Sequence, residues 1–299
     1  AFREGVNNLA LKYDVLFIDH YEMYQYVPLD YQGKTVLHQH NCEYLLWERF
    51  GKLDPNPLKK AVLYNQAWHI RRYEKKITRK VDTILAAPND KEELIKIGAP
   101  SGKFFETYHL GDTEWLDAPA LEFDKAENAL FFVGTLTWEA NVDGLLWMLE
   151  NVWPELLKRQ PGLQFYIVGK NPDARLIDMV AGLRDVHLEG FKDDLDEYYR
   201  RAKIFVAPLR FGSGTKVKVM NALYRGIPAI TTKIGIEGIM AEHRKHIWLA
   251  ETPEEWVDGV VTLLNDKTVW QTLSNNSRQL SAEKYTWDAV MENVRKAIG

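Results

Sequence analysis

A glycine-rich segment between an apolar run and a helical pattern is the feature of the sequence best suited to chemistry. The apolar run Ile204–Ala207 has the length of a strand, the turn that follows ends at Lys216, and helical spacing continues over Val217–Tyr224. Glycines let the backbone turn with its N–H groups outward, and a helix N-terminus adds unpaired donors and partial positive charge. The segment therefore predicts an anion site, although a plain strand-to-helix turn has the same pattern.

The residues that we expect around this anion lie in the turn and on one face of the helix. Lys218, Asn221 and Arg225 recur at spacings of three and four, whereas Val217, Met220 and Leu223 fall on another face. A polar stripe beside an anion site could contact the rest of a nucleotide, or it could be only the solvated face of the helix. The predicted set comprises Arg210, Phe211, Gly212, Ser213, Gly214, Thr215, Lys216, Lys218 and Asn221.

A second candidate lies in the first half, where His40 follows the apolar run Thr35–Leu37. Ligands of α/β proteins gather where strands end, and an imidazole there could bond a ligand or stabilise charge. A histidine at a strand end can equally be structural. Glu43, three residues later, could orient a hydroxyl or cap a helix. We expect no metal, because the histidines lack a neighbouring carboxylate and cysteine pattern with familiar ligand spacing.

Short β-rich runs alternate with helical patterns along the chain, which predicts an α/β protein with parallel sheets. The strands expected in the first half are 15–18, 35–37, 83–86 and 104–108. Those expected in the second half are 129–133, 164–168, 186–188, 204–207, 229–231 and 247–249.

The bulk composition limits the class of protein. The chain has 299 residues, of which 46% are hydrophobic, enough for two domains with buried cores. Its net charge of -4 gives no general attraction to nucleic acid, so we expect no nucleic-acid partner. The one cysteine, Cys42, suits a reducing compartment. No run is long enough to span a bilayer and Ala1–Leu11 lacks the form of a signal peptide, so the expected location is the cytoplasm.

A polar linker divides the chain. Gly111–Asn128 has few periodic apolar positions, two acidic clusters and Pro119, which places a boundary near residue 115. The predicted domains are 1–115 and 116–282, each Rossmann-like, with a helix over 283–299 that packs back across the domains. The first domain has only about four strands and no glycine-rich first turn. We interpret it as incomplete at its N-terminus; a naturally small domain is the alternative.

Four motifs, taken in order, resemble the sugar-donor domain of the group 1 glycosyltransferases. They are Phe132-Val133-Gly134 with Asn141-Val142-Asp143, Val168-Gly169, Leu188-Glu189-Gly190-Phe191 before Asp193-Asp194, and the loop at Pro208 followed by Gly226-Ile227-Pro228. The first half is similar to the acceptor domain of the same family in His40-Asn41-Cys42-Glu43, in the basic run before Val81 and in Asp112 with Trp115. The resemblance covers essentially the whole chain.

The resemblance implies a GT-B fold, in which two Rossmann-like domains face a cleft. The C-terminal domain would hold a nucleotide-sugar and the N-terminal domain an acceptor, without a metal or other cofactor. In this family the glycine-rich loop holds the diphosphate. Gly134 and Thr135 would approach the phosphates or sugar, and Gly190 and Phe191 would border the base. For Phe191 a place in the core is the alternative.

The sequence departs from the family pattern in two places. Of the two glutamates that commonly surround the loop, the first position is Gly212, as in a branch with a Gly-Ser-Gly loop, and the second is Asn221. Asparagine can still bond a ribose diol, but without the charge of a carboxylate. The usual basic pair after the first strand of this domain is also missing, which leaves Lys216 and Lys218 to neutralise the diphosphate.

The expected function is transfer of a sugar from a nucleotide-diphosphate donor to a glycan or glycolipid acceptor. The resemblance implies retention of configuration, with His40 and Glu43 as the catalytic candidates. A catalytically weak or inactive nucleotide-sugar-binding partner subunit is the alternative that Gly212 and Asn221 suggest, and a nucleotide-sugar epimerase is another. A basic stretch could dock on anionic lipid at the inner face of a membrane, or be a solvated helix. It contains Arg71, Arg72, Lys75, Lys76, Arg79 and Lys80.

Overall fold

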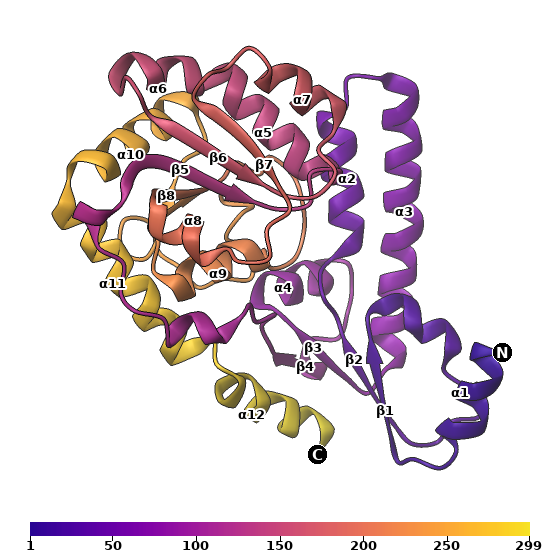
Figure 1. Ribbon diagram of the computed structural model, residues 1–299. Helices are drawn as coiled ribbons and strands as arrows, with labels where there is room; N and C mark the ends of the chain where they lie inside the picture. The colour runs from indigo at the N-terminus through magenta and orange to yellow at the C-terminus, as the bar shows by residue number, and fades with distance from the viewer. The chain divides into compact units, whose positions relative to one another are not determined.

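The computed structural model describes residues 1–299, which fold into two compact units (Figure 1). Unit 1 contains residues 1–109, 212–215 and 287–299, and unit 2 contains residues 110–211 and 216–286. Each unit is built on its own parallel sheet with helices on its faces. The predicted α/β class is therefore confirmed. None of the helices is both long and apolar enough to cross a membrane.

The sheet of unit 1 has four parallel strands in the order β1-β2-β3-β4. Its strands are β1 (Val15–Asp19), β2 (Lys34–His38), β3 (Thr83–Ala86) and β4 (Phe104–Glu106). All four predicted strands are present, and only β4 ends earlier than expected. The helical segments of this unit are α1 (Phe2–Ala10), η1 (Tyr21–Tyr26), α2 (Glu43–Leu53), α3 (Pro57–Lys80), α4 (Pro88–Lys96), η2 (Ser101–Lys103) and α12 (Trp287–Ile298).

Side-chain alternation in these strands produces two buried faces. On one face, Leu37 and Ile84 pack with Ile77 of α3 and Leu94 of α4. On the other face, Val36 and Leu85 pack with Ala297 of α12. Two hydrogen bonds hold the end of α12, from Thr83 Oγ1 to Ala297 O at 3.1 Å and from Lys34 Nζ to Ile298 O at 2.9 Å. The C-terminal helix thus completes the core of unit 1.

The sheet of unit 2 has six parallel strands in the order β10-β9-β8-β5-β6-β7. Its strands are β5 (Glu127–Val133), β6 (Gln164–Val168), β7 (Val186–Gly190), β8 (Ala202–Ala207), β9 (Ala229–Thr231) and β10 (Trp248–Leu249). Read in chain order, the chain starts at β5 in the middle, runs to β7 at one edge, then returns to β8 and runs to β10 at the other edge. This is the doubly wound order, and its switch point lies between β5 and β8.

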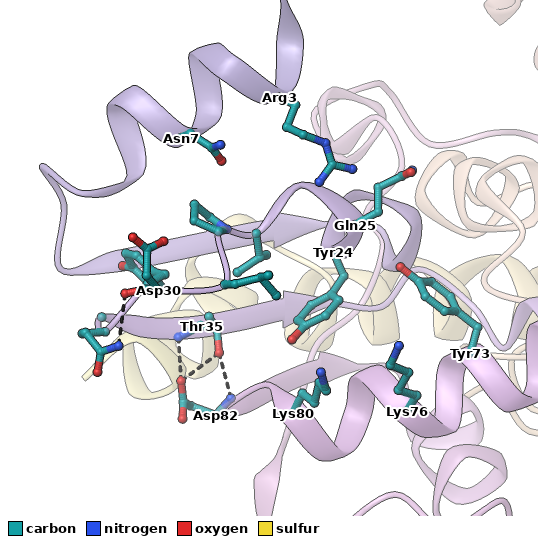
Figure 2. Close-up of a pocket in the computed structure, with 16 residues that line it drawn as sticks. Arg3, Asn7, Tyr24, Gln25, Asp30, Thr35, Tyr73, Lys76, Lys80 and Asp82 are labelled. Atoms are coloured by element: carbon teal, nitrogen blue, oxygen red, sulfur yellow. Dashed lines mark hydrogen bonds between the residues drawn. The ribbon is translucent and has the colours of Figure 1, made fainter.

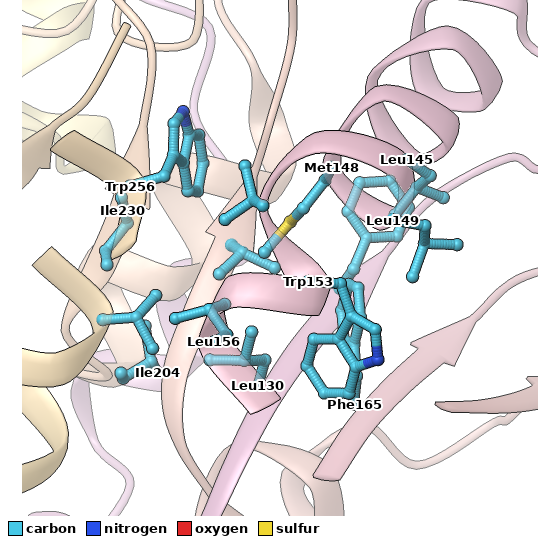
Figure 3. Close-up of a cluster of buried hydrophobic side chains, with 14 of the residues drawn as sticks. Leu130, Leu145, Met148, Leu149, Trp153, Leu156, Phe165, Ile204, Ile230 and Trp256 are labelled. Atoms are coloured by element: carbon cyan, nitrogen blue, oxygen red, sulfur yellow. The ribbon is translucent and has the colours of Figure 1, made fainter. Parts of the chain in front are cut away.

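Helices cover both faces of this sheet (Figure 1). Figure 3 shows the core on one face, where Leu130, Ile204 and Ile230 of the strands pack against helices that contribute Trp153 and Trp256. On the other face, Phe131 of β5 stacks on Tyr198 of α8. The helical segments of unit 2 are η3 (Thr113–Leu116), η4 (Phe123–Lys125), α5 (Glu139–Asn151), α6 (Trp153–Arg159), α7 (Ala174–Val180), α8 (Asp196–Arg201), α9 (Val217–Arg225), α10 (Pro253–Asn265) and α11 (Lys267–Lys284).

Candidate active site

In unit 2, three of the predicted phosphate-binding residues, Gly134, Lys216 and Lys218, follow β5 and β8 at the switch point of the sheet. Ligands of open α/β sheets bind outside the carboxyl ends of the strands at this point. Gly134 follows β5, and its N–H donates to Val168 O at 3.0 Å. A Cβ atom on Gly134 would lie 2.9 Å from both Lys218 Nζ and Asn141 Nδ2. A side chain at this position would displace the ammonium group, so glycine lets that group lie close to the backbone.

Lys218, on the first turn of α9, is the most perturbed cation of this corner. Its Nζ donates to Asn141 Oδ1 at 2.5 Å and lies 4.4 Å from the centre of the Phe132 ring. Asn141 in turn donates through Nδ2 to Thr135 O at 2.8 Å. Desolvation, with a smaller contribution from the charge of Lys216, lowers the pKa of Lys218 to about 7. The partner of this ammonium is a neutral amide and not a carboxylate, so an incoming anion would be its natural counter-ion.

The N-terminus of α9 has no side-chain cap. Lys216 occupies the N-cap position and its side chain is largely buried, with Nζ 3.8 Å from Glu237 Oε2. The partial positive charge of the helix end adds to these two lysines. Glu237 was not among the predicted residues, because it lies about twenty residues further on in a segment without regular structure. The corner thus combines two ammonium groups, one carboxylate and an uncapped helix end.

The polar stripe of α9 is not a solvated face. Arg225 is fully buried, where its Nε donates to Asp196 Oδ1 at 2.6 Å and its Nη1 to Pro119 O at 2.7 Å. Val217, which the pattern assigns to the buried face, is 45% exposed. Residues of the segment 110–126 pack along this side of the helix and bury Arg225. Arg225 is a structural anchor of that segment.

Asn221 lies on the same side and also holds this segment. Its Oδ1 accepts a hydrogen bond from the N–H of Asp112 at 2.8 Å, and Asp112 Oδ1 caps η3 by accepting from Glu114 N. This bond engages one lone pair of the carbonyl oxygen, so Asn221 offers its amide N–H groups and the other lone pair to a ribose hydroxyl. Its predicted role at the ribose stays a prediction.

Two further predicted residues lie at the end of β8. Arg210 donates through Nε to Asp143 Oδ2 at 3.0 Å, so part of its charge is already paired. Burial raises the pKa of Asp143, although Arg210 opposes that effect. Phe211 is 2% exposed and belongs to the core. Arg210 therefore keeps other N–H groups for a ligand, whereas the buried Phe211 ring is not available to one.

Gly190 ends β7, and Phe191 follows it with 55% of its surface exposed. The alternative of a core phenylalanine is therefore wrong. Lys170 Nζ lies 4.0 Å from the centre of the Phe191 ring, and Gly190 has a positive φ of 69°. An exposed aromatic ring at the carboxyl edge of the sheet can stack on a planar ligand. Its assignment to the base stays a prediction.

The centre of the glycine-rich loop, Gly212–Thr215, belongs to unit 1. Arg49 Nη1 donates to Gly212 O at 2.7 Å, and Ser213 Oγ donates to Cys42 O at 3.0 Å. Gly214 has a φ of 70°, and a Cβ atom there would lie 2.7 Å from Asn41 Cβ. Both its conformation and its contacts therefore require glycine.

The hydroxyl oxygen of Thr215 is buried without a hydrogen-bond partner. Buried hydroxyl groups nearly always have partners, so a bound ligand is a natural acceptor for this one. The predicted loop thus lies beside the turn that carries His40, since Gly214 would also bring a Cβ atom to 3.0 Å from His40 O.

His40 is one of four histidines at the carboxyl edge of the sheet of unit 1. Asp19 Oδ1, at the end of β1, bonds His38 Nδ1 at 2.9 Å and His40 Nε2 at 2.6 Å. The ring centres of His40 and His109 are 4.5 Å apart, and the ring of His20 lies 5.3 Å from that of His40. His20 has a φ of 76°, which is uncommon for a residue other than glycine and is typical of strained positions at functional sites.

Burial decides the ionisation of this histidine cluster. Desolvation, helped by His40 and His38, lowers the pKa of His109 to about 4. It also lowers the pKa of His38, against the effect of Asp19. Burial alone would raise the pKa of Asp19, but hydrogen bonds to His40 and His38 outweigh it and hold the pKa below its usual value. At neutral pH the cluster therefore contains a carboxylate and at least two neutral imidazoles.

The turn between His40 and Glu43 is fixed by a buried carboxylate on α3. Glu74, which is 0% exposed, accepts from Glu43 N at 2.8 Å, from Tyr44 N at 3.3 Å and from Gln39 Nε2 at 2.9 Å. It thereby caps α2, whose N-cap Cys42 makes no side-chain cap of its own. Glu43 itself accepts from Asn41 Nδ2 at 3.0 Å. The catalytic candidates His40 and Glu43 thus lie on a turn that hydrogen bonds to the buried Glu74 carboxylate hold in place.

Removing the Glu74 carboxyl should destabilise the protein. We expect Glu74→Ala to lower the free energy of unfolding by about 2–4 kcal/mol, because it leaves buried donors without partners. Glu74→Gln should cost less, since it keeps one acceptor oxygen. Chemical denaturation measures both, with exposed Glu48→Ala as the matched control. A loss no larger in Glu74→Ala than in Glu48→Ala would contradict the capping role.

The pKa of Glu74 also predicts a pH dependence. Desolvation raises the pKa from 4.5 to about 8, despite opposing hydrogen bonds from the backbone. Because the folded state holds the proton more tightly, this contribution to stability is complete below the unfolded pKa and is lost as pH rises through about 8. The slope is at most about 1.4 kcal/mol per pH unit. Denaturation of wild type and Glu74→Gln across this range should show the slope in wild type alone.

A cavity of about 870 Å³ lies elsewhere in unit 1, among α1, the segment 27–33 and α3 (Figure 2). Thr35 and Asp82, which hydrogen-bond each other in its wall, mark the beginnings of β2 and β3. The cavity therefore lies at the amino ends of the strands, away from the edge where ligands of α/β sheets bind. We do not assign it to the reaction.

The basic stretch forms the C-terminal half of α3, and all six of its basic residues are exposed. Arg72 lies 4.7 Å above the half-exposed ring of Trp68, and Arg79 Nε donates to Gly98 O. The exposure of these basic residues agrees with both alternatives, a solvated helix and a surface that docks on lipid. Contact with a membrane stays a prediction.

Residues 127–266 match the family described as glycosyl transferases group 1. Among curated proteins, one from Klebsiella pneumoniae, described as an uncharacterized 44.6 kDa protein in the cps region, is 22% identical. That alignment covers 96% of this chain and 75% of the relative. The resemblance predicted from the motifs is confirmed.

Solved structures share the fold. S. aureus TarM aligns with 99% of this chain and 57% of its own, at a TM-score of 0.74 and 13% identity. HepE of Anabaena, solved in complex with UDP, aligns with 99% of this chain and 81% of its own, at a TM-score of 0.76 and 12% identity. The chain thus spans little more than half the length of TarM. The predicted GT-B fold is confirmed.

Proposed function

Since residues 127–266 belong to the group 1 glycosyltransferases, we propose that the chain transfers a sugar from a nucleoside-diphosphate donor to a hydroxyl group. The observation that carries this proposal is the corner of unit 2 at the switch point. There Lys218, held beside Gly134, and Lys216, at the uncapped end of α9, offer two cations for a diphosphate. HepE, of the same fold, has been solved with UDP and with UDP-glucose.

In the proposed reaction, the bond between the anomeric carbon and the diphosphate oxygen breaks, and the nucleoside diphosphate leaves with the electron pair. The two lysines and the helix end stabilise its charge, which develops most strongly in the transition state. The acceptor hydroxyl forms the new bond to the anomeric carbon, and its proton passes to the leaving phosphate. Attack from the same face as departure gives retention. We assign no divalent ion to the diphosphate, because these cations take its place.

Glycans and glycolipids are the acceptors that we favour. The relative described as a protein in the cps region supports that choice. TarM supports it too, since it has been solved with fondaparinux, α-GlcNAc-glycerol and UDP. We assign the acceptor to unit 1, where His40 and Glu43 lie on the turn fixed by Glu74. His40 would bond the transferred sugar, and Glu43 would orient the acceptor hydroxyl.

A nucleotide-sugar-binding subunit without catalysis is the second candidate function. It is favoured by Asn221, whose carbonyl oxygen is already bonded to Asp112 N, and by Gly212 at the position where the family commonly has a glutamate. Both features weaken interactions with the sugar donor, and neither removes the cations that would hold the diphosphate.

Transfer assays separate the two candidates. Nucleotide-sugars that bind the chain are incubated with a broad panel of glycan and glycolipid acceptors, and released nucleoside diphosphate and new glycoside are both measured. The proposal predicts one equivalent of glycoside for each diphosphate formed in excess of hydrolysis. Tight binding without turnover on any acceptor would favour the non-catalytic subunit, and the absence of nucleotide binding would reject both.

The pKa of Lys218 predicts how binding depends on pH. Bound diphosphate favours the charged form of Lys218. Because the pKa of Lys218 is about 7, part of the free protein has a neutral lysine at neutral pH, and this part must take up a proton on binding. Affinity should therefore fall as pH rises above about 7, by at most about tenfold per pH unit. The terminal phosphate of the ligand has a pKa of about 6, so it is already ionised in this pH range.

Calorimetry in two buffers of different ionisation enthalpy counts the protons taken up. The Lys218→Met variant provides the control, since it should bind weakly at every pH and take up no proton from this source. Equal proton uptake in the variant and in wild type would show that Lys218 is not the group that titrates.

Replacing Asn221 tests its ribose role. Asn221→Glu supplies a second oxygen, so that one can accept from Asp112 N while the other accepts from a ribose hydroxyl. Charge-assisted bonds contribute about 1.5–3 kcal/mol, so affinity for the nucleoside diphosphate should rise about 10-fold or more. The 2′,3′-dideoxy nucleotide serves as the control and should gain nothing. An equal gain for both nucleotides would locate the effect away from the ribose.

A further inference from the structure

We propose that the cavity among α1, the segment 27–33 and α3 binds a phosphate monoester that an anionic membrane lipid presents. The cavity has a volume of about 870 Å³, which is large enough for the phosphate and part of its carrier. It lies at the amino ends of the strands of unit 1. The inference therefore goes beyond the proposed function, and it rests on no residue of the diphosphate corner or of the turn that carries His40.

Three cations line the cavity, and none of them has a carboxylate partner in the protein. Lys76 and Lys80 lie one turn apart on α3, both exposed and both without a hydrogen bond or ion pair to another residue. The guanidinium carbon of Arg3, on α1, lies 5.5 Å from the centre of the Tyr26 ring. Figure 2 shows the side chains of Arg3, Lys76 and Lys80 directed toward the space between the two helices. An anion in that space would supply the counter-charge that all three lack.

The charge of α3 is not neutralised within the helix either. Its last ten residues contain six cations and a single carboxylate, Glu74. That carboxylate is fully buried and caps α2, so it is not a partner for the exposed cations. A groove beside the cavity is lined by five of these cations, two of which, Lys76 and Lys80, also line the cavity. Basic clusters of this density bind anionic lipid surfaces.

Two phenol groups make the cavity more selective than a charged surface. Tyr24 of η1 and Tyr73 of α3 are half-buried in its wall, and neither hydroxyl group has a hydrogen-bond partner. Burial raises the pKa of both phenols, so each is protonated at neutral pH and can donate a hydrogen bond. A phosphate monoester has three terminal oxygens that accept hydrogen bonds and a charge of about −1.5 to −2 at neutral pH. The cations and hydroxyl groups of the wall match both properties.

The two carboxylates of the wall leave this arrangement intact. Asp82 is bound to Thr35 at the beginning of β2, where its Oδ2 accepts from the N–H at 2.8 Å and from Oγ1 at 2.7 Å. Asp30 is exposed, and Figure 2 shows it at the opposite end of the cavity from Tyr73 and Lys76. The part of the wall formed by Tyr73 and Lys76 therefore offers only donors and positive charge to a ligand.

The surroundings of the cavity favour a lipid as the carrier of the phosphate. Leu29 of its wall is fully exposed, and so is more than half of Phe2 at the start of α1. Trp68, which lies under Arg72 on α3, is also half-exposed. Exposed apolar and aromatic side chains beside Lys and Arg are typical of surfaces that lie in the interface of a membrane. A free phosphorylated compound would leave these apolar side chains in water.

The test measures binding of the full chain, without nucleotide, to vesicles in a flotation assay. The vesicles contain phosphatidylcholine alone, or phosphatidylcholine with phosphatidic acid or phosphatidylserine, adjusted to equal surface charge. Phosphatidic acid ends in a phosphate monoester, whereas the phosphate of phosphatidylserine is a diester. We expect phosphatidic acid vesicles to bind about tenfold more tightly than phosphatidylserine vesicles, and phosphatidylcholine not to bind. Free glycerol phosphate should displace the chain from phosphatidic acid vesicles, and its own affinity should be lower.

Variants separate the cavity from the general basic surface. Tyr73→Phe keeps the charge and removes one donor, so binding to phosphatidic acid vesicles should weaken about tenfold while binding to phosphatidylserine vesicles stays within about twofold. Lys76→Gln should weaken binding to both kinds of vesicle, by about fivefold or more. Lys52→Gln, which replaces an exposed lysine of α2, is the matched control and should bind as wild type.

Equal affinity of the wild-type chain for the two anionic vesicles would overturn the proposal in favour of a general basic surface, and that comparison requires no variant to fold. Unchanged binding by a folded Tyr73→Phe protein, or no displacement by glycerol phosphate, would exclude the cavity as the site. Glycerol phosphate that binds as tightly as the vesicles would overturn the lipid as the carrier. All readouts are made without nucleotide, so failure here would leave the proposed transfer reaction standing, and failure of transfer would leave this site standing.

Discussion

Lys218→Met should weaken the binding of a nucleoside diphosphate about 30- to 1000-fold and leave the affinity for the bare nucleoside unchanged within about twofold. The variant removes a cation beside Gly134, in the corner that we propose for the diphosphate. Truncating one partner of a buried charged pair costs about 2–4 kcal/mol, which corresponds to that factor. Methionine is close to lysine in length and can pack on Phe132, so the fold should be retained. Calorimetric titration with the nucleoside, its monophosphate and its diphosphate measures the effect.

The comparison across the three ligands makes this prediction specific. Lys216→Ala should behave in the same way, since its ammonium lies at the start of α9. Lys233→Met, which replaces an exposed lysine of the same unit, is the control and should bind all three ligands as wild type does. If Lys218→Met weakened nucleoside and diphosphate equally, the phosphate assignment would be wrong.

His40→Ala should lower turnover about 100- to 10,000-fold while the affinity for the nucleoside diphosphate stays within about threefold of wild type. A positioned histidine that takes part in proton transfer or stabilises charge in the transition state contributes a factor of this size. The change leaves the lysines of the diphosphate corner intact. Steady-state transfer rates and calorimetry, measured on the same preparations, separate the two quantities.

Two controls are needed for His40. His69→Gln replaces an exposed histidine on α3 and should leave turnover unchanged. His109→Gln changes the neighbouring ring without removing His40, so its turnover shows whether the effect belongs to His40 itself. Turnover in His40→Ala within about threefold of wild type would remove His40 from the chemistry.

The strands and the glycine-rich loop could be predicted from the sequence because both depend on local patterns. Apolar runs of strand length bounded by Gly or Pro identify parallel strands whose neighbours bury both faces. For the same reason Gly134 and the loop after β8 could be placed at strand ends. Their convergence at one switch point follows from the strand order, which the chain adopts as the doubly wound topology predicts.

The missed features all depend on contacts between residues distant in the chain. Arg225 follows a helical polar stripe, and nothing local shows that residues near Pro119 bury it. His109 lies about seventy residues from His40, beyond two further strands, so the histidine cluster has no motif. Glu74 sits in a densely basic stretch that resembles a solvated helix, yet its position on the inner face of α3 makes it the cap of α2. Helical periodicity alone does not show which polar residues are buried, and burial is what gives Arg225 and Glu74 their structural roles.

The end of β5, the start of α9 and the lysines beside them are the groups that we propose to hold the diphosphate of a nucleotide. Calorimetric titration of the wild-type chain tests this with the five common nucleosides, their monophosphates and their diphosphates, with and without Mg²⁺. We expect at least one nucleoside diphosphate to bind in one-to-one ratio, at least about tenfold more tightly than its monophosphate, and with an affinity that Mg²⁺ does not change. Absence of binding by every nucleotide, or equal affinity for a nucleoside and its diphosphate, would contradict it.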